Sequence, residues 1–279
     1  GMAFIKNKIL YVLNDSNKYV PMYTVNKEVF LTADKIFGLF SYDDYSKAVR
    51  SPLSQIVTRI YLLNDDETIR DEISEFLKSG NVNFVRAQGQ TRSGTLSFMN
   101  FNNQLTPSPI NDMLWKANKL RIDIGLYYNG TVYWKRCGIF TPIDPTIDEN
   151  TRTLNVSVKD KFALLDGTIS GKSGGNLRIA AGTSVRKAIE MCLLSDRGNN
   201  KSYDTKPIIF PAKYEKVTTP YTITRTPNYS VGEIIIELAN MIFCDVYYND
   251  DGQLVLTSGI EDTTVDWDKK PISWKYDED

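Results

Sequence analysis

The feature that most constrains the fold is an alternating stretch at residues 121–167, which predicts two neighbouring antiparallel strands at its start. Residues 121–126 place Ile, Ile and Leu at every second position, the pattern of a strand with one buried face. Asn129 and Gly130 follow, and this pair suits a tight hairpin turn because both central residues of a type I′ turn need positive φ. The partner strand is predicted over residues 131–140, which are rich in aromatic and β-branched residues.

The same stretch predicts a third strand. A reversal at residues 142–150 leads into residues 151–158, where Leu and Val again alternate with polar neighbours. Residues 159–166 then predict one helical turn that ends at Gly167. Three strands joined in this order form an antiparallel meander. Its sequence pattern indicates no position for a nucleophile, a base or a metal ligand.

The remaining first half is predicted to add strands and two short helices. Apolar spacing favours a helix over residues 32–45, and another over residues 68–77 that stops at Ser79 and Gly80. Residues 64–67 are expected to form a turn and residues 102–118 a long loop. Further strands are predicted at residues 9–13, 20–25, 55–63, 81–86 and 93–100.

The second half predicts two helices and a hairpin. One helix starts at Ser184, and another covers residues 234–243 after Ser230 and Glu233, whose spacing is that of a capping box. A strand is expected at residues 221–226. Two more strands, at 245–248 and 253–257, flank the turn at residues 249–252, and residues 266–279 are expected to be an incomplete element or a linker.

These elements predict an α+β fold that is mainly β, with two antiparallel barrel-like or sandwich-like domains and a few short helices. At 279 residues the chain exceeds the usual size of one domain. A Gly- and Ser-rich loop at residues 168–176 marks the expected boundary. The predicted division is therefore an N-terminal segment at 1–50 packed on the first domain, a β-rich domain at 51–170, and an α+β domain at 171–279.

Composition removes several classes of chemistry. The chain has no histidine, so Ser-His-Asp and Cys-His catalysis and His-ligated metals are excluded within it. Its 33 basic and 34 acidic residues leave a net charge of -1, which argues against broad binding to a phosphate backbone. Cys137, Cys192 and Cys244 each lie in an apolar run and are predicted to be buried free thiols. No apolar run reaches the ~18 residues of a membrane span.

Short motifs for nucleotide or metal binding are incomplete. Residues 167–173 resemble a phosphate-binding loop but have three residues, rather than four, before the Gly-Lys pair. An inter-domain loop explains them better. Residues 64–67 and 249–252 resemble fragments of calcium loops, but neither continues to the glutamate at the twelfth position, so turn chemistry is preferred. No cofactor, metal or catalytic residue is therefore predicted.

Carboxylates for glycoside hydrolysis leave one alternative open. The candidates near the strand ends of the meander are Asp123, Asp144, Asp148 and Glu149. A solvated strand face accounts for them more simply. The neighbouring aromatic residues suit sugar stacking in principle, although cross-strand packing is the commoner role of such a pattern. These aromatic residues are Tyr127, Tyr128, Tyr133 and Trp134.

The order of elements resembles the N-terminal hub module of tail-tip proteins from long-tailed phages. The resemblance covers about residues 55–260. In the first half it includes residues 62–67, 73–81, 92–100 and 138–140 and the closing run at 159–167. In the second half it includes residues 182–185, 229–231 and 246–254. The N-terminal 50 residues match this family less well.

The resemblance implies a structural protein of the phage or prophage tail tip, made in the bacterial cytoplasm and without enzymatic activity. It implies a homotrimeric ring that continues the tail tube and contacts the distal tail ring, the tube and the tape measure. Receptor-binding or wall-degrading parts would be carried below. DNA would pass through such a ring without specific binding, and we expect a mildly acidic bore because basic side chains would retain phosphates.

Two other classes rank below this one. A carbohydrate-binding module or a carboxylate-dependent glycosidase comes second, and a nucleotide-dependent enzyme third. Self-association of the purified protein would favour the first class. Glycan binding, or a cleft with two facing carboxylates, would favour the second.

Overall fold

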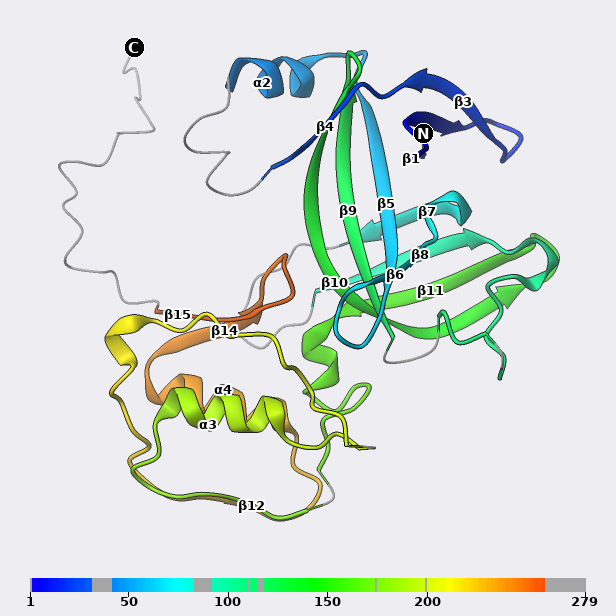
Figure 1. Cartoon of the computed structure of the whole chain (residues 1–279). Coiled ribbons are helices and arrows are strands. Elements are labelled where there is room, and N and C mark those ends of the chain that lie inside the picture. Colours follow the sequence, from blue (N-terminus) through cyan, green and yellow to red (C-terminus); the bar gives the residue numbers. More distant parts are fainter. Residues whose placement is uncertain are drawn as a thin grey trace, which may run out of the picture.

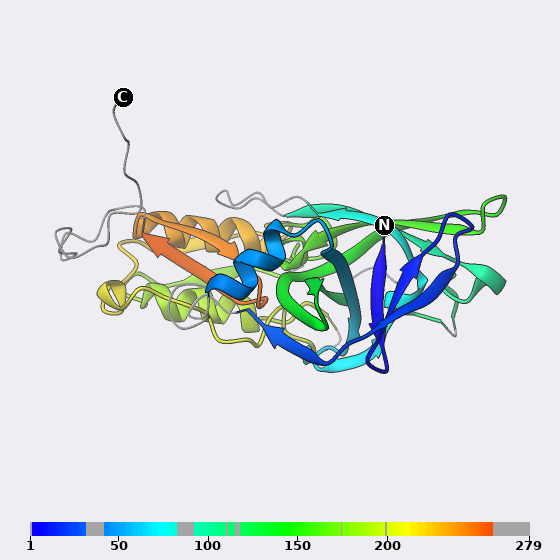
Figure 2. The same ribbon diagram turned by 90° about the horizontal axis from the view of Figure 1, so that it is seen from above.

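A computed structural model describes residues 2–31, 42–82, 92–109, 111–114, 118–173, 175–198 and 200–258. The predicted α+β, mainly β fold is confirmed, because antiparallel strands dominate and helices are few and short. A strand-rich first half and a second half with two packed helices lie end to end, which makes the molecule elongated (Figures 1 and 2).

The N-terminal residues form a separate three-stranded antiparallel sheet of β1 (Ala3–Lys6), β2 (Ile9–Leu13) and β3 (Tyr19–Thr24). The predictions at 9–13 and 20–25 are confirmed. Strand β4 (Lys27–Phe30) then joins the main sheet parallel to β10. Of the helix predicted at 32–45, residues 32–41 lie outside the described part, and α2 (Tyr42–Arg50) covers the end.

The main sheet has the strand order β6-β5-β9-β10-β11-β8-β7, with β4 added on β10. Its β9–β10 hairpin confirms the predicted turn, with φ of 48° at Asn129 and 80° at Gly130. The predicted strands at 55–63 and 93–100 are also confirmed. The bounds are β5 Gln55–Leu63, β6 Ile69–Glu72, β7 Leu77–Val82, β8 Ser93–Met99, β9 Lys119–Tyr128, β10 Thr131–Asp148 and β11 Thr153–Asp160.

Strand β10 is longer than predicted and joins the two parts of the sheet. It pairs with β9 as far as Phe140 and with β11 from Phe140 to Asp148, so the predicted reversal over 142–150 is wrong at its start. Beyond Phe140, β10 no longer pairs with β9 along one of its edges. Proline has no N–H to donate, so Pro142 is tolerated in a strand with an edge of this kind. Between Ile143 and Thr146 the register shifts, because β10 has one more residue than β11 there. This bulge includes Asp144, whose φ is 46°.

The helix predicted at 68–77 is wrong. Strand β6 occupies its start, a 3-10 turn (η1, Ser74–Phe76) its middle, and β7 begins at Leu77. A helix would bury Ile69 and Ile73 on the same face, but Ile69 is 50% exposed and Ile73 only 1%. The backbone N–H of Ile73 instead donates to Ile60 O on β5, at 3.0 Å. Pairing with β5 has overridden the local helical spacing.

The second half packs two helices against two hairpin-like sheets. Ser184 caps α3 (Val185–Leu194) and Ser230 caps α4 (Val231–Met241), as predicted. The reciprocal bonds of the capping box are present, because Ser230 Oγ accepts from Glu233 N and Glu233 Oε2 accepts from Ser230 N. The strands are β12 Leu177–Ile179 paired with β13 Ile223–Arg225, and β14 Cys244–Tyr248 paired with β15 Leu254–Ser258.

The core of the second half starts before the loop chosen as the domain boundary. Phe162, on the 3-10 turn η3 (Lys161–Leu164), and Leu165 belong to the same apolar cluster as α3, α4 and β14. The helical turn predicted over 159–166 is confirmed by η3. The division at 1–50, 51–170 and 171–279 stays a prediction, and the terminal element expected at 266–279 lies outside the described residues.

Candidate functional site

Asp123, one of the glycosidase candidates, is fully buried among three guanidinium groups, so the prediction of a solvated strand face is wrong for this residue. Arg121 on the same strand donates to both carboxylate oxygens, at 3.2 and 2.9 Å. The cross-strand register places Arg59 on β5 and Arg136 on β10 opposite it, with nearest contacts of 3.4 and 3.9 Å. A carboxylate enclosed in this way is a counter-ion within the sheet and has no open side for a substrate.

The other candidate carboxylates lie at the far end of β10. Asp144 is exposed on the bulge, and Asp148 accepts from Asn150 N at 3.0 Å, which closes the β10–β11 turn beside the exposed Glu149. Asp144 is eight residues beyond Arg136 in the same strand, a strand length of about 25 Å. Glycosidase carboxylates lie about 5–9.5 Å apart, so Asp123 forms no such pair with them.

The aromatic residues beside Asp123 pack inside the protein. Tyr127, Tyr133 and Trp134 are at most 9% exposed, and Tyr128 packs against the cluster under α2. The indole N–H of Trp134 donates to Glu28 Oε1 at 3.0 Å, and the Arg59 guanidinium lies 4.1 Å from a ring centroid of Trp134. This confirms the cross-strand packing interpretation and removes a sugar-stacking platform.

The loop at residues 167–173 is packed against the start of α4 rather than being a phosphate cradle. The N–H groups of Val231 and Gly232, which a helix N-terminus would offer to an anion, donate to Gly171 O and Leu165 O at 2.8 and 2.7 Å. Gly171 has φ of 102°, and a Cβ there would lie 2.3 Å from Leu165 O. Only glycine fits this close approach.

The two turns that resemble calcium loops are ordinary turns that meet around one lysine. Lys161 is fully buried, and its Nζ lies 2.8 Å from each of three oxygens, Glu67 Oε1, Asp204 Oδ2 and Gly252 O. The Lys161 ammonium group donates a hydrogen bond to Gly252 O and forms ion pairs with the two carboxylates. Glu67 follows β5 in the first half, whereas Asp204 and Gly252 belong to the second.

A buried arginine attaches the same hairpin turn to the main sheet. Arg92 is 4% exposed and donates to Asp250 Oδ1 at 2.8 Å and to Asn249 O at 3.3 Å. It also donates to Cys137 O on β10 at 2.6 Å and lies 3.5 Å from Asp160. We call Glu67, Arg92, Lys161, Asp204 and residues 249–252 the ionic seam, because these groups join the two halves.

Burial around the ionic seam shifts the pKa of several groups. Burial, and then Asp204, which accepts from Tyr248 Oη at 2.8 Å, raise the pKa of Tyr248 well above 10.0. Burial and the nearby Lys161 lower the pKa of Lys119, and burial raises that of Asp160 against hydrogen bonds from Phe162 N and Arg92 N. Tyr248 is therefore a protonated donor near neutral pH, and structural pairing explains these perturbations.

The cysteines are buried free thiols, as predicted. Burial raises the pKa of Cys137 to about 11 and that of Cys192 to about 12, which disfavours the reactive thiolate. Within the described ranges, no three Cys, Asp or Glu side chains are grouped to hold a metal ion. Nor does any helix among the described residues have the length and apolarity to cross a bilayer.

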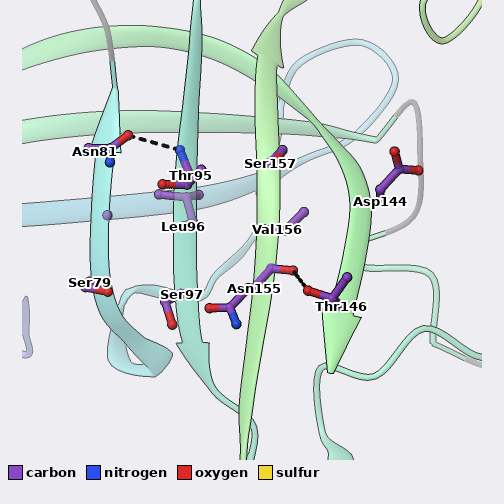
Figure 3. A pocket seen from close by; sticks show the side chains of 11 residues that line it. Ser79, Asn81, Thr95, Leu96, Ser97, Asp144, Thr146, Asn155, Val156 and Ser157 are labelled. Atoms are coloured by element: carbon purple, nitrogen blue, oxygen red, sulfur yellow. Dashed lines mark hydrogen bonds between the residues drawn. The ribbon is translucent and has the colours of Figure 1, made fainter. Parts of the chain in front are cut away.

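An open groove of about 540 Å³ lies on the outward face of β7, β8, β11 and β10. The register aligns Ser79, Ser97, Asn155 and Thr146 in one row across the four strands. Figure 3 shows these side chains together with those of the neighbouring row and Asp144 at the rim. We call this cavity the polar groove. The second row is Asn81, Thr95 and Ser157.

Sequence reasoning missed both the ionic seam and the polar groove. A faint signal exists for the seam, because Lys161 stands between Asp160 and an apolar run, and a lysine there needs a buried partner. The identity of that partner depends on residues more than 40 positions away along the chain. For the groove, the Ser and Thr alternation of β8 shows only an exposed strand face.

The sequence matches no protein-family model and no curated protein. Among solved structures, the chain is similar to the 43 kDa tail protein of prophage MuSo2 from Shewanella oneidensis, with 16% identity over 73% of this chain and a TM-score of 0.46. It is also similar to the tail protein from Neisseria meningitidis MC58 (14%, 72% of this chain, TM-score 0.42) and to prophage tail protein gp18 from Listeria monocytogenes EGD-e (12%, 72%, 0.39). The chain spans about half the length of each, namely 53%, 51% and 50%.

Proposed function

We propose that this chain is a structural subunit of a phage or prophage tail, placed at the tip or baseplate hub, where copies of it form a ring. The proposal rests on the resemblance in element order. It is supported by the ionic seam, which joins the two halves, and by exposed aliphatic residues suited to contact with another copy.

The surface with these aliphatic residues runs from the end of α2 to β5, the strand that follows α2 in the chain. Val49, Leu53 and Ile56 are 55%, 83% and 60% exposed, and Ile124 on the adjacent β9 is 37% exposed. We call these four residues the aliphatic patch. Helix α2 itself is held on the sheet by Tyr45, whose ring packs edge-on against Tyr133 at 5.7 Å. Ile56 and Ile124 are diagonal neighbours across the β5–β9 pair, and Val49 and Leu53 shortly precede Ile56 in the chain. Contiguous exposed apolar surface marks many protein interfaces, and we take these residues as the observation that supports self-association.

The two outer edges of the main sheet offer further surfaces for contact with another copy. Strands β6 and β7 end the main sheet, and within the described residues each pairs along one edge only. Unpaired strand edges are an aggregation hazard in a monomer, whereas in a closed ring they pair with or lie against the next copy. We infer a homotrimer from the family resemblance.

A charge placed in the aliphatic patch is expected to weaken self-association. Leu53→Lys should raise the dissociation constant of the oligomer about tenfold or more, because charging a central apolar contact costs about 1.4 kcal/mol or more. Size-exclusion chromatography with light scattering over a concentration series measures this constant. Wild-type protein should approach the mass of three chains as concentration rises.

The matched control is Leu194→Lys, which charges another exposed leucine (57%) on α3 in the second half. It should leave the association curve unchanged. Equal curves for wild type and Leu53→Lys, or an equal loss in the Leu194→Lys variant, would contradict the assignment of the interface to the aliphatic patch.

Within a tail, the ring would contact the distal tail ring, the tube and the tape measure, and it would carry receptor-binding or wall-degrading parts. DNA would pass through the ring without specific binding. These partners follow from the resemblance. A bore lined mainly by Lys and Arg would contradict DNA passage, because such side chains retain phosphates.

A further inference from the structure

The polar groove has a lining that is hydroxyl and amide in character. Of the eight polar side chains that line it, seven are Ser, Thr or Asn, and the eighth is Asp144. No lysine, arginine or aromatic residue is among the described lining residues. Leu96 and Val156 contribute only backbone, because their side chains are 3% and 2% exposed and face the core.

Most of these polar groups have no partner within the described part of the protein. Asn81 Oδ1 accepts from Thr95 N at 3.3 Å, and Thr146 Oγ1 donates to Asn155 O at 3.4 Å (Figure 3). The hydroxyls of Ser79, Thr95, Ser97 and Ser157 and the amide of Asn155 make no bond to the described residues. They are free to donate to and accept from a ligand.

The rows of the sheet give these groups a regular spacing. Neighbouring strands lie about 4.8 Å apart, so a row across four strands spans about 14 Å. In the second row, the β10 residue that pairs with Ser157 is Ile143, which has no polar group. The bulge in β10 places the carboxylate of Asp144 at this end of the row instead. A carboxylate there can accept hydrogen bonds from two hydroxyls at once.

We propose that the polar groove binds a neutral oligosaccharide, with Asp144 accepting from the hydroxyls of one sugar unit. A lining without cations disfavours phosphates and nucleic acid. A lining without exposed apolar side chains disfavours a helix or an apolar ligand. Protein interface cores are depleted of serine and enriched in aromatic residues and methionine, so a second copy of the chain fits poorly here. This inference is independent of the proposed tail role.

The test uses the whole chain and three defined probes, maltohexaose, cellohexaose and chitohexaose. Amide chemical shifts are followed by transverse-relaxation-optimised NMR on deuterated protein. At least one probe should shift the amides of Thr95, Ser97, Asn155 and Ser157 in a saturable manner. We expect a dissociation constant of about 0.1–10 mM, because none of the described lining residues offers an aromatic ring to stack on a sugar.

Three variants separate specific binding from a surface effect. Asn155→Leu, Ser97→Ala and Asp144→Asn should each weaken binding about two- to tenfold, the range for one lost hydrogen bond. Thr224→Val, which removes an exposed hydroxyl from β13, should leave binding unchanged.

Three results would overturn the inference. One is the absence of any shift of the groove amides at about 10 mM of every probe. Another is binding that the three groove variants leave intact. A third is a shift of the same amides that depends on protein concentration without sugar, which would assign the groove to self-association.

Discussion

Lys161→Met is expected to destabilise the protein by about 3–5 kcal/mol, the usual cost of removing one partner of a buried ion pair. The substitution keeps the length of the side chain but removes the charge between Glu67 and Asp204, which lie in the two halves of the molecule. Both carboxylates are at most 8% exposed, so water replaces the ammonium group poorly. Urea unfolding followed by tryptophan fluorescence measures the loss.

Two further variants show whether the loss comes from the ionic seam. Lys187→Met, on the exposed face of α3, should change stability by less than about 0.5 kcal/mol. A double variant of Lys161→Met with Asp204→Asn should recover more than half of the loss, because Asp204 is the carboxylate left without a cation among the described residues, whereas Glu67 keeps Lys206 Nζ at 3.1 Å. A Lys161→Met protein as stable as the wild type would refute the seam as a joint between the halves.

Asp123→Asn is expected to destabilise the protein by about 2–4 kcal/mol, a smaller cost because the three surrounding arginines keep some contact with water. The amide retains the shape of the side chain but removes the negative charge that Arg59, Arg121 and Arg136 share. These guanidinium groups are 13%, 14% and 29% exposed, so their mutual repulsion is only partly screened. Thermal and urea unfolding both report the change.

Asp144→Asn is the matched control for the same chemical change on an exposed carboxylate of the neighbouring strand. Asparagine accepts the positive φ of this position, so stability should stay within about 0.5 kcal/mol of wild type. A glycosidase would behave differently, since Asp123→Asn would then remove activity and leave the fold intact. An Asp123→Asn protein of unchanged stability would contradict the counter-ion role given to Asp123.

Local patterns in the sequence predicted correctly the elements whose conformation depends on residues close together in the chain. The Asn129-Gly130 hairpin and the caps at Ser184 and Ser230 are confirmed because each depends on backbone geometry within a few residues. The burial of the three cysteines is confirmed for a similar reason, since each one lies in an apolar run.

Pairing between distant residues explains what the sequence did not predict. Residues 68–77 have helical spacing, but the edge of β5 was available to pair with them and decided their conformation. The extension of β10 past Pro142 depends on β11, which follows it, and on the bulge at Asp144. Neither partner is visible within a local window of sequence.

The contacts within the ionic seam and the polar groove also depend on residues that are distant in the sequence. The seam requires Lys161, Asp204 and Gly252 to meet across 91 positions of sequence, and the polar groove requires four strands in one register. Side-chain chemistry at each position was readable from the sequence. The juxtaposition of those side chains was not, because it is a property of the folded sheet order.

We propose that this chain closes into a ring through the aliphatic patch. Electron cryo-microscopy of the purified protein at about 100 μM tests this proposal, because even micromolar contacts are populated at that concentration. We expect closed rings with threefold symmetry in which Val49, Leu53, Ile56 and Ile124 lie between copies. Single copies throughout, or open chains joined through other surfaces with the aliphatic patch facing solvent, would contradict it.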